Sequence, residues 1–376
     1  MRDHHVPNRP MIWTRPSEWR VASAFALAAA LGSCGAGERP SQAATTAVAT
    51  DTGYKAVMSV PAATPRPVSA PAGLAAELAS LSHQFEGRVG IAVRSVERGW
   101  SIDANGDLRL PQQSVSKLWV AMTVLDLRDA GRLKLEDPVT LTKSDITLFH
   151  QPIAALIKGD GYHTTVGELL QRALTMSDNT ANDRLLTYVG GPTAVREFIR
   201  RKQLGNIRFG PGERLLQSGT AGLTWKPEYS TYGAFDRARA QLSKEARLNA
   251  FDRYIADPPD GAAPAAIAAA LARLKRGDLL SRASTDYLMS TMESSHTGKQ
   301  RLRGAVPGGW TFGHKTGTGQ DLGRRIAGYN DVGFLIAPDG QSYTIAVMIG
   351  ETAKDIPARQ HLMQAVVEAV VANHRG

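Results

Sequence analysis

The sequence predicts an α+β fold in which one antiparallel sheet is built from both ends of the folded region and an all-helical lobe is inserted between them. Residues 88–96 alternate apolar and polar side chains as a strand does, and strand patterns return near the C-terminus at 310–315, 331–337 and 343–349. Most of the long stretch between them has helical periodicity. No glycine-rich phosphate-binding motif follows a predicted strand, which argues against a nucleotide-binding α/β fold.

The other predicted elements follow in chain order. Apolar residues at helical spacing predict a first helix over 74–85. The Asn105–Gly106 pair indicates a turn and suggests a second strand at 99–103, paired with the first as a hairpin. Further helices are predicted over residues 114–127, 166–175, 180–188, 192–202, 264–275, 282–293 and 358–372.

Residues 1–34 have the pattern of a lipoprotein signal peptide. Two arginines precede an apolar run at 21–31, which is too short to span a bilayer and long enough for a signal-peptide core. The run leads through Leu-Gly-Ser into Cys34, which we expect to carry the lipid. The alternative is an ordinary signal peptide cut a few residues later. The first interpretation predicts an exported, periplasmic protein that is anchored to the membrane.

The rest of the chain divides into a linker and one catalytic domain. Residues 35–72 are rich in Ala, Pro, Thr and Ser and are expected to form a disordered tether, whereas 73–376 is long enough for one large domain. The net charge of +9 comes without basic runs or interleaved aromatic residues, so no nucleic-acid partner is predicted. Because the chain has a single cysteine, no disulfide within it is predicted. Because it has no HExxH motif, we expect no metal, and no other cofactor is predicted. We expect a monomer.

The segment from Ser114 to Lys117 opens a predicted helix and contains the first candidate catalytic pair. A lysine three residues after a serine lies on the same face of a helix, and a lysine with a lowered pKa can take the serine proton. The helix start adds backbone N–H groups for a developing oxyanion. Ser114 is therefore the candidate nucleophile and Lys117 the candidate base; the alternative is an exposed helix start.

A second polar motif, Ser177-Asp178-Asn179, follows a predicted apolar helix. These residue types favour helix N-termini, so a helix cap is the alternative interpretation. The functional interpretation makes the Ser177 hydroxyl a proton relay and the Asn179 amide a hydrogen-bond donor to substrate.

The third motif runs from Lys315 to Thr318 at the end of a predicted strand. Gly317 would let a substrate lie flush against the strand edge. Lys315 and Thr316 can hold a carboxylate, and the Thr318 N–H can join that of Ser114 in an oxyanion hole. The alternative is a charged strand end before a turn.

Together these motifs resemble the SxxK, SDN and KTG set of class A β-lactamases and penicillin-binding proteins. Gly190-Gly191-Pro192 and the strand start at 330–333 strengthen the resemblance to class A, which covers residues 74–376. It implies a β-lactamase/transpeptidase-like fold and a serine hydrolase that opens a β-lactam amide through an acyl-enzyme on Ser114. The alternatives are a penicillin-binding or D-Ala-D-Ala peptidase-like enzyme acting on cell-wall peptides, an esterase, and a lipid-anchored sensor.

One glutamate separates these alternatives, because class A enzymes use it to activate the deacylating water. Glu213 has the spacing that the resemblance requires, and Gln217 could help to hold the water. A solvated turn residue is the alternative for Glu213. Glu245 is a rival base in an ExxLN phrase, but it comes late and its charged helical stretch favours an exposed helix face.

Several positions depart from the class A pattern. Whether Glu213 or Glu245 is the base, residues 218–259 contain an extra segment that the class A pattern lacks, and its role is open. Pro211 stands where the family has an arginine that clasps the loop. Both departures put the rigidity of the loop and the substrate range in doubt. His150 falls where the family has an aromatic gate, with a surface histidine as the alternative. Either Arg324 or Arg325 is expected to meet a substrate carboxylate.

Overall fold

The structure is a computed structural model that describes residues 69–375, so Cys34 and all but the last residues of the expected linker lie outside it. Its centre is a five-stranded antiparallel sheet in the order β2-β1-β11-β10-β7. The strands are β1 (Arg88–Ser95), β2 (Ser101–Ala104), β7 (Thr311–Thr318), β10 (Tyr329–Ile336) and β11 (Ser342–Glu351). None of the helices in this described part is both long and apolar enough to cross a membrane.

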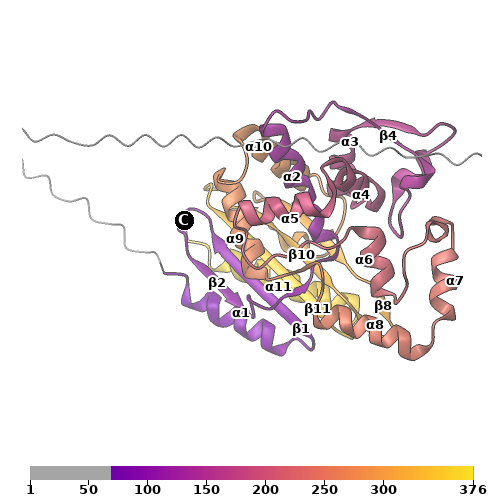
Figure 1. Cartoon of the computed structure of the whole chain (residues 1–376). Coiled ribbons are helices and arrows are strands. Elements are labelled where there is room, and N and C mark those ends of the chain that lie inside the picture. Colours follow the sequence, from indigo (N-terminus) through magenta and orange to yellow (C-terminus); the bar gives the residue numbers. More distant parts are fainter. Residues whose placement is uncertain (1–68, 376) are drawn as a thin grey trace, which may run out of the picture. The chain divides into compact units, whose positions relative to one another are not determined.

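Both ends of the folded region contribute to this sheet, as the sequence predicts. The N-terminal strand β1 pairs with β11, with Ile91 opposite Val347. Alternating side chains of each strand point to opposite faces, so both faces of the sheet must be covered. Helices α1 (Ala72–Gln84) and α11 (Ile356–Ala372) cover one face, and α9 (Pro264–Arg276) lies against the other (Figure 1).

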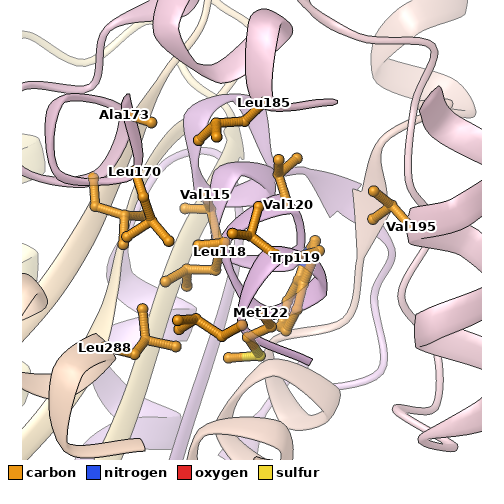
Figure 2. Close-up of a cluster of buried hydrophobic side chains, with 14 of the residues drawn as sticks. Val115, Leu118, Trp119, Val120, Met122, Leu170, Ala173, Leu185, Val195 and Leu288 are labelled. Carbon is orange, nitrogen blue, oxygen red and sulfur yellow. The ribbon is translucent and has the colours of Figure 1, made fainter. Parts of the chain in front are cut away.

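The helical lobe is built around α2 (Lys117–Asp129), whose first nine residues are all buried. Figure 2 shows Leu118, Trp119 and Met122 of α2 surrounded by apolar side chains from other helices, among them Leu185 and Leu288. The remaining helices are α3 (Val166–Gln171), α4 (Asn179–Tyr188), α5 (Gly191–Arg201), α6 (Glu213–Thr220), α7 (Ala234–Gln241), α8 (Lys244–Ala256) and α10 (Arg282–Glu293).

Short strands and turns complete the fold, so the lobe is not entirely helical. The two-stranded pairs are β3 (Leu110–Pro111) with β6 (Gly261–Ala262), β4 (Pro138–Leu141) with β5 (Tyr162–Thr165), and β8 (Asp321–Leu322) with β9 (Arg325–Ile326). The short helices that matter for the site are the 3₁₀ helix η1 (Gln113–Ser116) and the π-helix η4 (Arg172–Met176).

The predicted hairpin exists, but its turn was misplaced. The chain turns at Gly99, which has φ +74° and donates its N–H to the carbonyl oxygen of Ser95. Asn105 follows β2 instead, and its side-chain amide donates to the Val89 carbonyl oxygen of the neighbouring strand. Both segments carry turn residues, and the pairing of β2 with β1 decides between them.

Candidate active site

Ser114 lies on η1, directly before α2, and its backbone is pressed against the edge strand β7. A Cβ atom on Gly317 would lie 2.3 Å from the carbonyl oxygen of Gln112, so only glycine permits this approach. Gln113 has a positive φ of 53°, a conformation that is uncommon for a residue with a side chain. Asp260 accepts its backbone N–H at 2.7 Å, which holds the turn that presents Ser114.

Lys117 joins three of the predicted site residues. Its Nζ donates to Ser114 Oγ at 2.6 Å, to Asn179 Oδ1 at 2.7 Å and to Glu213 Oε1 at 2.6 Å. The lysine side chain is completely buried and that of Glu213 nearly so. A buried ion pair of this kind is tolerated because every ammonium proton has an acceptor.

Glu213 is the first residue of α6, where the positive end of the helix dipole favours an acidic side chain. Asp183 on α4 accepts the backbone N–H groups of Glu213 and Arg214 at 2.9 and 3.3 Å and so caps α6. Burial, together with the neighbouring Glu213 charge, raises the pKa of Asp183 to about 6. Gln217, one turn further along α6, donates its amide to Glu213 Oε2 at 3.1 Å.

The loop before α6 is held without an arginine at position 211. Arg196 on α5 donates to the carbonyl oxygens of Phe209 and Gly210 at 3.0 and 3.3 Å. Together with the Asp183 cap, this contact fixes the loop at both ends of the Gly-Pro-Gly stretch. Arg196 and Asp183 therefore hold this loop in place of the arginine that the family has at position 211.

Ser177 ends the π-helix η4 in the left-handed region, with φ 61°. A left-handed backbone conformation is strained in a residue with a side chain, and such strained residues, like π-helical turns, often occur at functional sites. Lys315 Nζ donates to Ser177 Oγ at 2.8 Å, and burial, with a contribution from the Lys117 charge, lowers the pKa of Lys315 well below its usual value. Asp178, between Ser177 and Asn179, accepts the Ala181 N–H and caps α4, so the motif supplies both a cap and two site residues.

A cleft of about 510 Å³ opens in front of these residues, between β7 and the helical lobe. Arg301 is buried beside it and donates to the carbonyl oxygens of Gly317 and Asn330 at 3.0 and 2.7 Å and to Thr318 Oγ1 at 2.5 Å. His150 lines the cleft next to Phe149, as its family position suggests. The other lining residues are Ser114, Ser177, Asn179, Gln217, Arg239, Thr297, Gly298, Thr316, Thr318, Gly319, Gln320 and Asp321.

Three predicted candidates lie elsewhere. Glu245 is exposed in the first turn of α8 and does not line the cleft. The expectation that Arg324 or Arg325 meets a substrate carboxylate is wrong, because both line a different concavity. The β8–β9 hairpin turns Arg325 toward Glu351 at 2.6 Å and Asp252 at 2.8 Å, and these carboxylates occupy its guanidinium.

Sequence reasoning also missed residues that line or brace the site. Arg301 and Arg239 supply the arginines of the cleft, yet no local motif marks either of them. Tyr254 on α8 accepts the Gln113 side-chain amide at 2.6 Å and donates to Asp260 Oδ1 at 3.0 Å. Tyr254 is so far from Gln113 in the sequence that no local pattern could indicate this contact. Within residues 69–375 no group of acidic, histidine or cysteine side chains is arranged to hold a metal ion.

Comparison with known proteins agrees with this geometry. Residues 73–373 match the sequence model of the β-lactamase enzyme family. The chain is 27% identical over 281 residues to the extended-spectrum β-lactamase PER-1 of Pseudomonas aeruginosa, covering 74% of this chain and 80% of that protein. A β-lactamase structure from Chitinophaga pinensis has 26% identity and a TM-score of 0.63, covering 79% of this chain and 97% of the other.

A second structure is informative about the class. An ancestral class A β-lactamase is 32% identical to this chain, with a TM-score of 0.64, and covers 80% of this chain and 100% of its own. The similarity spans the whole domain that carries Ser114, Ser177 and Lys315 rather than a single motif. The chain therefore belongs to the β-lactamase enzyme family, and within it to class A.

Proposed function

We propose that this protein hydrolyses β-lactams through a covalent acyl-enzyme on Ser114. One observation carries the proposal: the Lys117 ammonium contacts Ser114 Oγ and Glu213 Oε1 simultaneously, each at 2.6 Å. A nucleophile, a cation and a carboxylate in contact can move a proton away from the attacking hydroxyl. The contact of Glu213 with Lys117 supports giving this role to Glu213, and the exposure of Glu245 argues against giving it to that residue.

In the acylation step, Ser114 Oγ attacks the carbonyl carbon of the β-lactam. The Lys117 ammonium gives one proton to the Glu213 carboxylate and takes the proton that Ser114 releases. The backbone N–H groups of Ser114 and Thr318 stabilise the oxyanion, and such donors are typically worth about 10²–10³ in rate each. The C–N bond then breaks, and the Ser177 hydroxyl delivers a proton to the leaving nitrogen. Ser177 takes a replacement proton from Lys315, which contacts it at 2.8 Å. The proton released by Ser114 makes up this loss, so Glu213 is a carboxylate again before deacylation.

Recognition of the ring carboxylate falls to the β7 side of the cleft. Thr316 lines the cleft there, and its Oγ1 is 2.8 Å from the hydroxyl of Thr297. Lys315 lies buried behind it, with its Nζ on Ser177 Oγ, and would act on the carboxylate through its charge and through Ser177. Arg301 adds a positive charge through its contact with Thr318. Asn179, which already donates to the Leu148 carbonyl oxygen at 2.9 Å, keeps a second amide proton for the substrate side chain.

In the deacylation step, Glu213 takes a proton from a water molecule, which attacks the acyl carbon. The bond from that carbon to Ser114 Oγ then breaks, and the proton returns to Ser114 through Lys117, which contacts both residues. Gln217 holds the Glu213 carboxylate at 3.1 Å and so orients it. Removing a positioned general base typically slows a step by about 10²–10⁴-fold. Glu213 therefore separates a hydrolase from an enzyme of this fold that is merely acylated.

The test is a nitrocefin time course with substrate in large excess over a soluble form beginning near Ala72. We expect continued turnover that Ser114→Ala abolishes, and a Glu213→Gln variant that stalls as a covalent acyl-enzyme detectable by mass spectrometry. Glu245→Gln is the matched control and should leave turnover unchanged. A single stoichiometric burst from the unaltered protein would contradict hydrolysis and indicate a penicillin-binding enzyme instead.

Export to the periplasm and lipid attachment at Cys34 are proposed from the sequence alone. The apolar run at 21–31 before the cysteine supports them. Metabolic labelling with radioactive palmitate should mark the full chain and not Cys34→Ser; labelling of neither would contradict the anchor. We also propose a monomer, and a dimer mass by light scattering of the soluble form would refute that.

A further inference from the structure

The segment from 222 to 257, called here the α7–α8 segment, covers one end of the cleft. Figure 1 shows α7 at the margin of the domain, beyond α6. Arg239 on α7 nevertheless lines the same cleft as Ser114. The proposed mechanism gives this arginine no task.

Two contacts hold α7 across this end of the cleft. On one side, the Phe235 ring packs edge-on against Phe149, with ring centroids 5.2 Å apart, and Phe149 lines the cleft beside His150. On the other side, Arg239 Nη2 donates to the carbonyl oxygen of Asp321 at 2.7 Å, just beyond the end of β7. The helix therefore spans from one wall to the other, and Arg239 is held in place facing the cleft.

The charge of Arg239 is unbalanced at close range. Within residues 69–375 its guanidinium forms no ion pair, and Asp236 and Asp321 act on it only from beyond ion-pair distance. Partial burial and the nearby Arg247 charge lower the pKa of Arg239, although the group stays protonated at any physiological pH. A fixed, partly buried arginine with free N–H donors favours an anionic ligand, which it can bind through two parallel hydrogen bonds.

Arg239 lines the cleft but is not among the residues proposed to bind the ring carboxylate. That site is assigned to Lys315, Thr316 and Arg301, whereas Arg239 contacts Asp321, after the chain has left β7. A β-lactam bound with its carbonyl at Ser114 and its ring carboxylate at Lys315 must extend its acylamino side chain the other way. Arg239 stands on that path.

A second observation also indicates a ligand at this end. Gln320 lines the cleft, is only 8% exposed, and donates its amide to the carbonyl oxygen and Oε1 of Gln217 at 2.8 and 3.0 Å. Its own Oε1 is buried and accepts no hydrogen bond from the described part of the chain. An unpaired buried acceptor is unfavourable. A rotation of the Gln320 amide toward the cleft would let it accept an N–H of the substrate side chain.

We propose that Arg239 is a specificity-determining residue that binds an anionic group on the acylamino side chain of the substrate. The proposal rests on the proposed function, because it takes Ser114 as the point of acylation. It makes the α7–α8 segment a selector for β-lactams that carry a second carboxylate, in addition to the one on the ring. Asp321, which also lines the cleft, opposes this selection and limits its strength.

Benzylpenicillin and carbenicillin test the proposal, because carbenicillin differs only by a carboxylate on the side chain. We expect Arg239→Ala to lower kcat/KM for carbenicillin by roughly tenfold to a hundredfold, since a hydrogen bond to a charged group is worth that much. Benzylpenicillin should change by less than about twofold, because it has no side-chain carboxylate for Arg239 to bind and the contact of Phe235 with Phe149 still anchors α7. Arg239→Lys should restore part of the carbenicillin rate.

Arg237→Ala is the matched control, because Arg237 is exposed on the same helix and does not line the cleft. It should leave both substrates unchanged. If Arg239→Ala lowered kcat/KM equally for both substrates, the proposal would be overturned and Arg239 would be a structural link between α7 and Asp321. An unchanged kcat/KM for both substrates would overturn the proposal as well. Failure of the unaltered protein to turn over benzylpenicillin would instead contradict the proposed function.

Discussion

The β7 edge and the α7–α8 segment both border Ser114, but different kinds of contact hold them there. At the β7 edge, backbone lies directly on backbone, because Gly317 has no side chain and Asn330 donates to the carbonyl oxygens of Pro111 and Gln112 at 2.8 and 3.0 Å. Close packing of this kind leaves almost no freedom for displacement. The groups that we propose to carry out the chemistry are fixed by this edge.

The α7–α8 segment is held mainly by the ends of side chains. Tyr254 reaches Gln113 through its hydroxyl, Arg239 reaches Asp321 through its guanidinium, and Phe235 meets Phe149 edge-on. Its apolar contacts form two small clusters separate from the main cores. Because the two regions are held so differently, substitutions in the α7–α8 segment can change substrate preference while the catalytic groups stay in place.

Gly317→Ala tests directly whether the backbone contact at the β7 edge fixes the catalytic groups, and it should have the largest effect of the substitutions that test this comparison. A Cβ atom there would meet the Gln112 carbonyl oxygen at 2.3 Å, so β7 or the turn before Ser114 must move. We expect a loss of about 10²-fold in nitrocefin kcat/KM, the typical effect of displacing reacting groups by about 1 Å. Urea unfolding should show destabilisation of about 1–3 kcal/mol, as is usual for overpacking.

Gly308→Ala is the control for this experiment, since no heavy atom lies within 4 Å of its added Cβ and its φ needs no glycine. It should change neither turnover nor stability measurably. If Gly317→Ala retained full activity, the backbone contact would not be what fixes the site, and the contrast with the α7–α8 segment would fail.

The sequence predicted the parts of the site that local patterns encode. Ser114 and Lys117 share a helix start, and Lys315 to Thr318 end a strand, so spacing within one element was sufficient to find them. The sheet was predictable for a similar reason, because apolar alternation marks each strand wherever its partner lies. What these motifs could not indicate is how the elements meet.

The missed features depend on contacts between distant parts of the chain. Helix α6 begins after Gly210-Pro211-Gly212 and takes its cap from Asp183, 30 residues earlier, so no capping residue precedes it in the sequence. Arg325 follows the KTG motif closely, yet the β8–β9 hairpin directs it to Glu351. Arg239 is held at the cleft by the packing of Phe235 on Phe149 and by its own hydrogen bond to Asp321, both of them contacts between distant residues.

Asp260 joins the two regions and gives the smallest of the expected effects. It is 1% exposed, and its carboxylate accepts the Gln113 N–H from the turn before Ser114 and the Tyr254 hydroxyl from the α7–α8 segment. Burial raises the pKa of Asp260 to about 6, against 3.8 for an ordinary aspartate. The folded protein therefore keeps a proton on this group at pH values where the unfolded chain has lost it.

A raised carboxyl pKa stabilises the fold at low pH, and this stability is lost as the pH rises through about 6. Between pH 5 and 6 we expect the unfolding free energy of the unaltered protein to fall by about 1 kcal/mol more than that of Asp260→Asn, which cannot ionise. Urea unfolding of both proteins at the two pH values measures the difference, and contributions from other carboxyl groups, including Asp183, cancel. A difference that does not vary with pH would mean that Asp260 stays ionised in this range. The junction would then be a charged clamp, and the α7–α8 segment would be tied to the catalytic turn as firmly as β7 is.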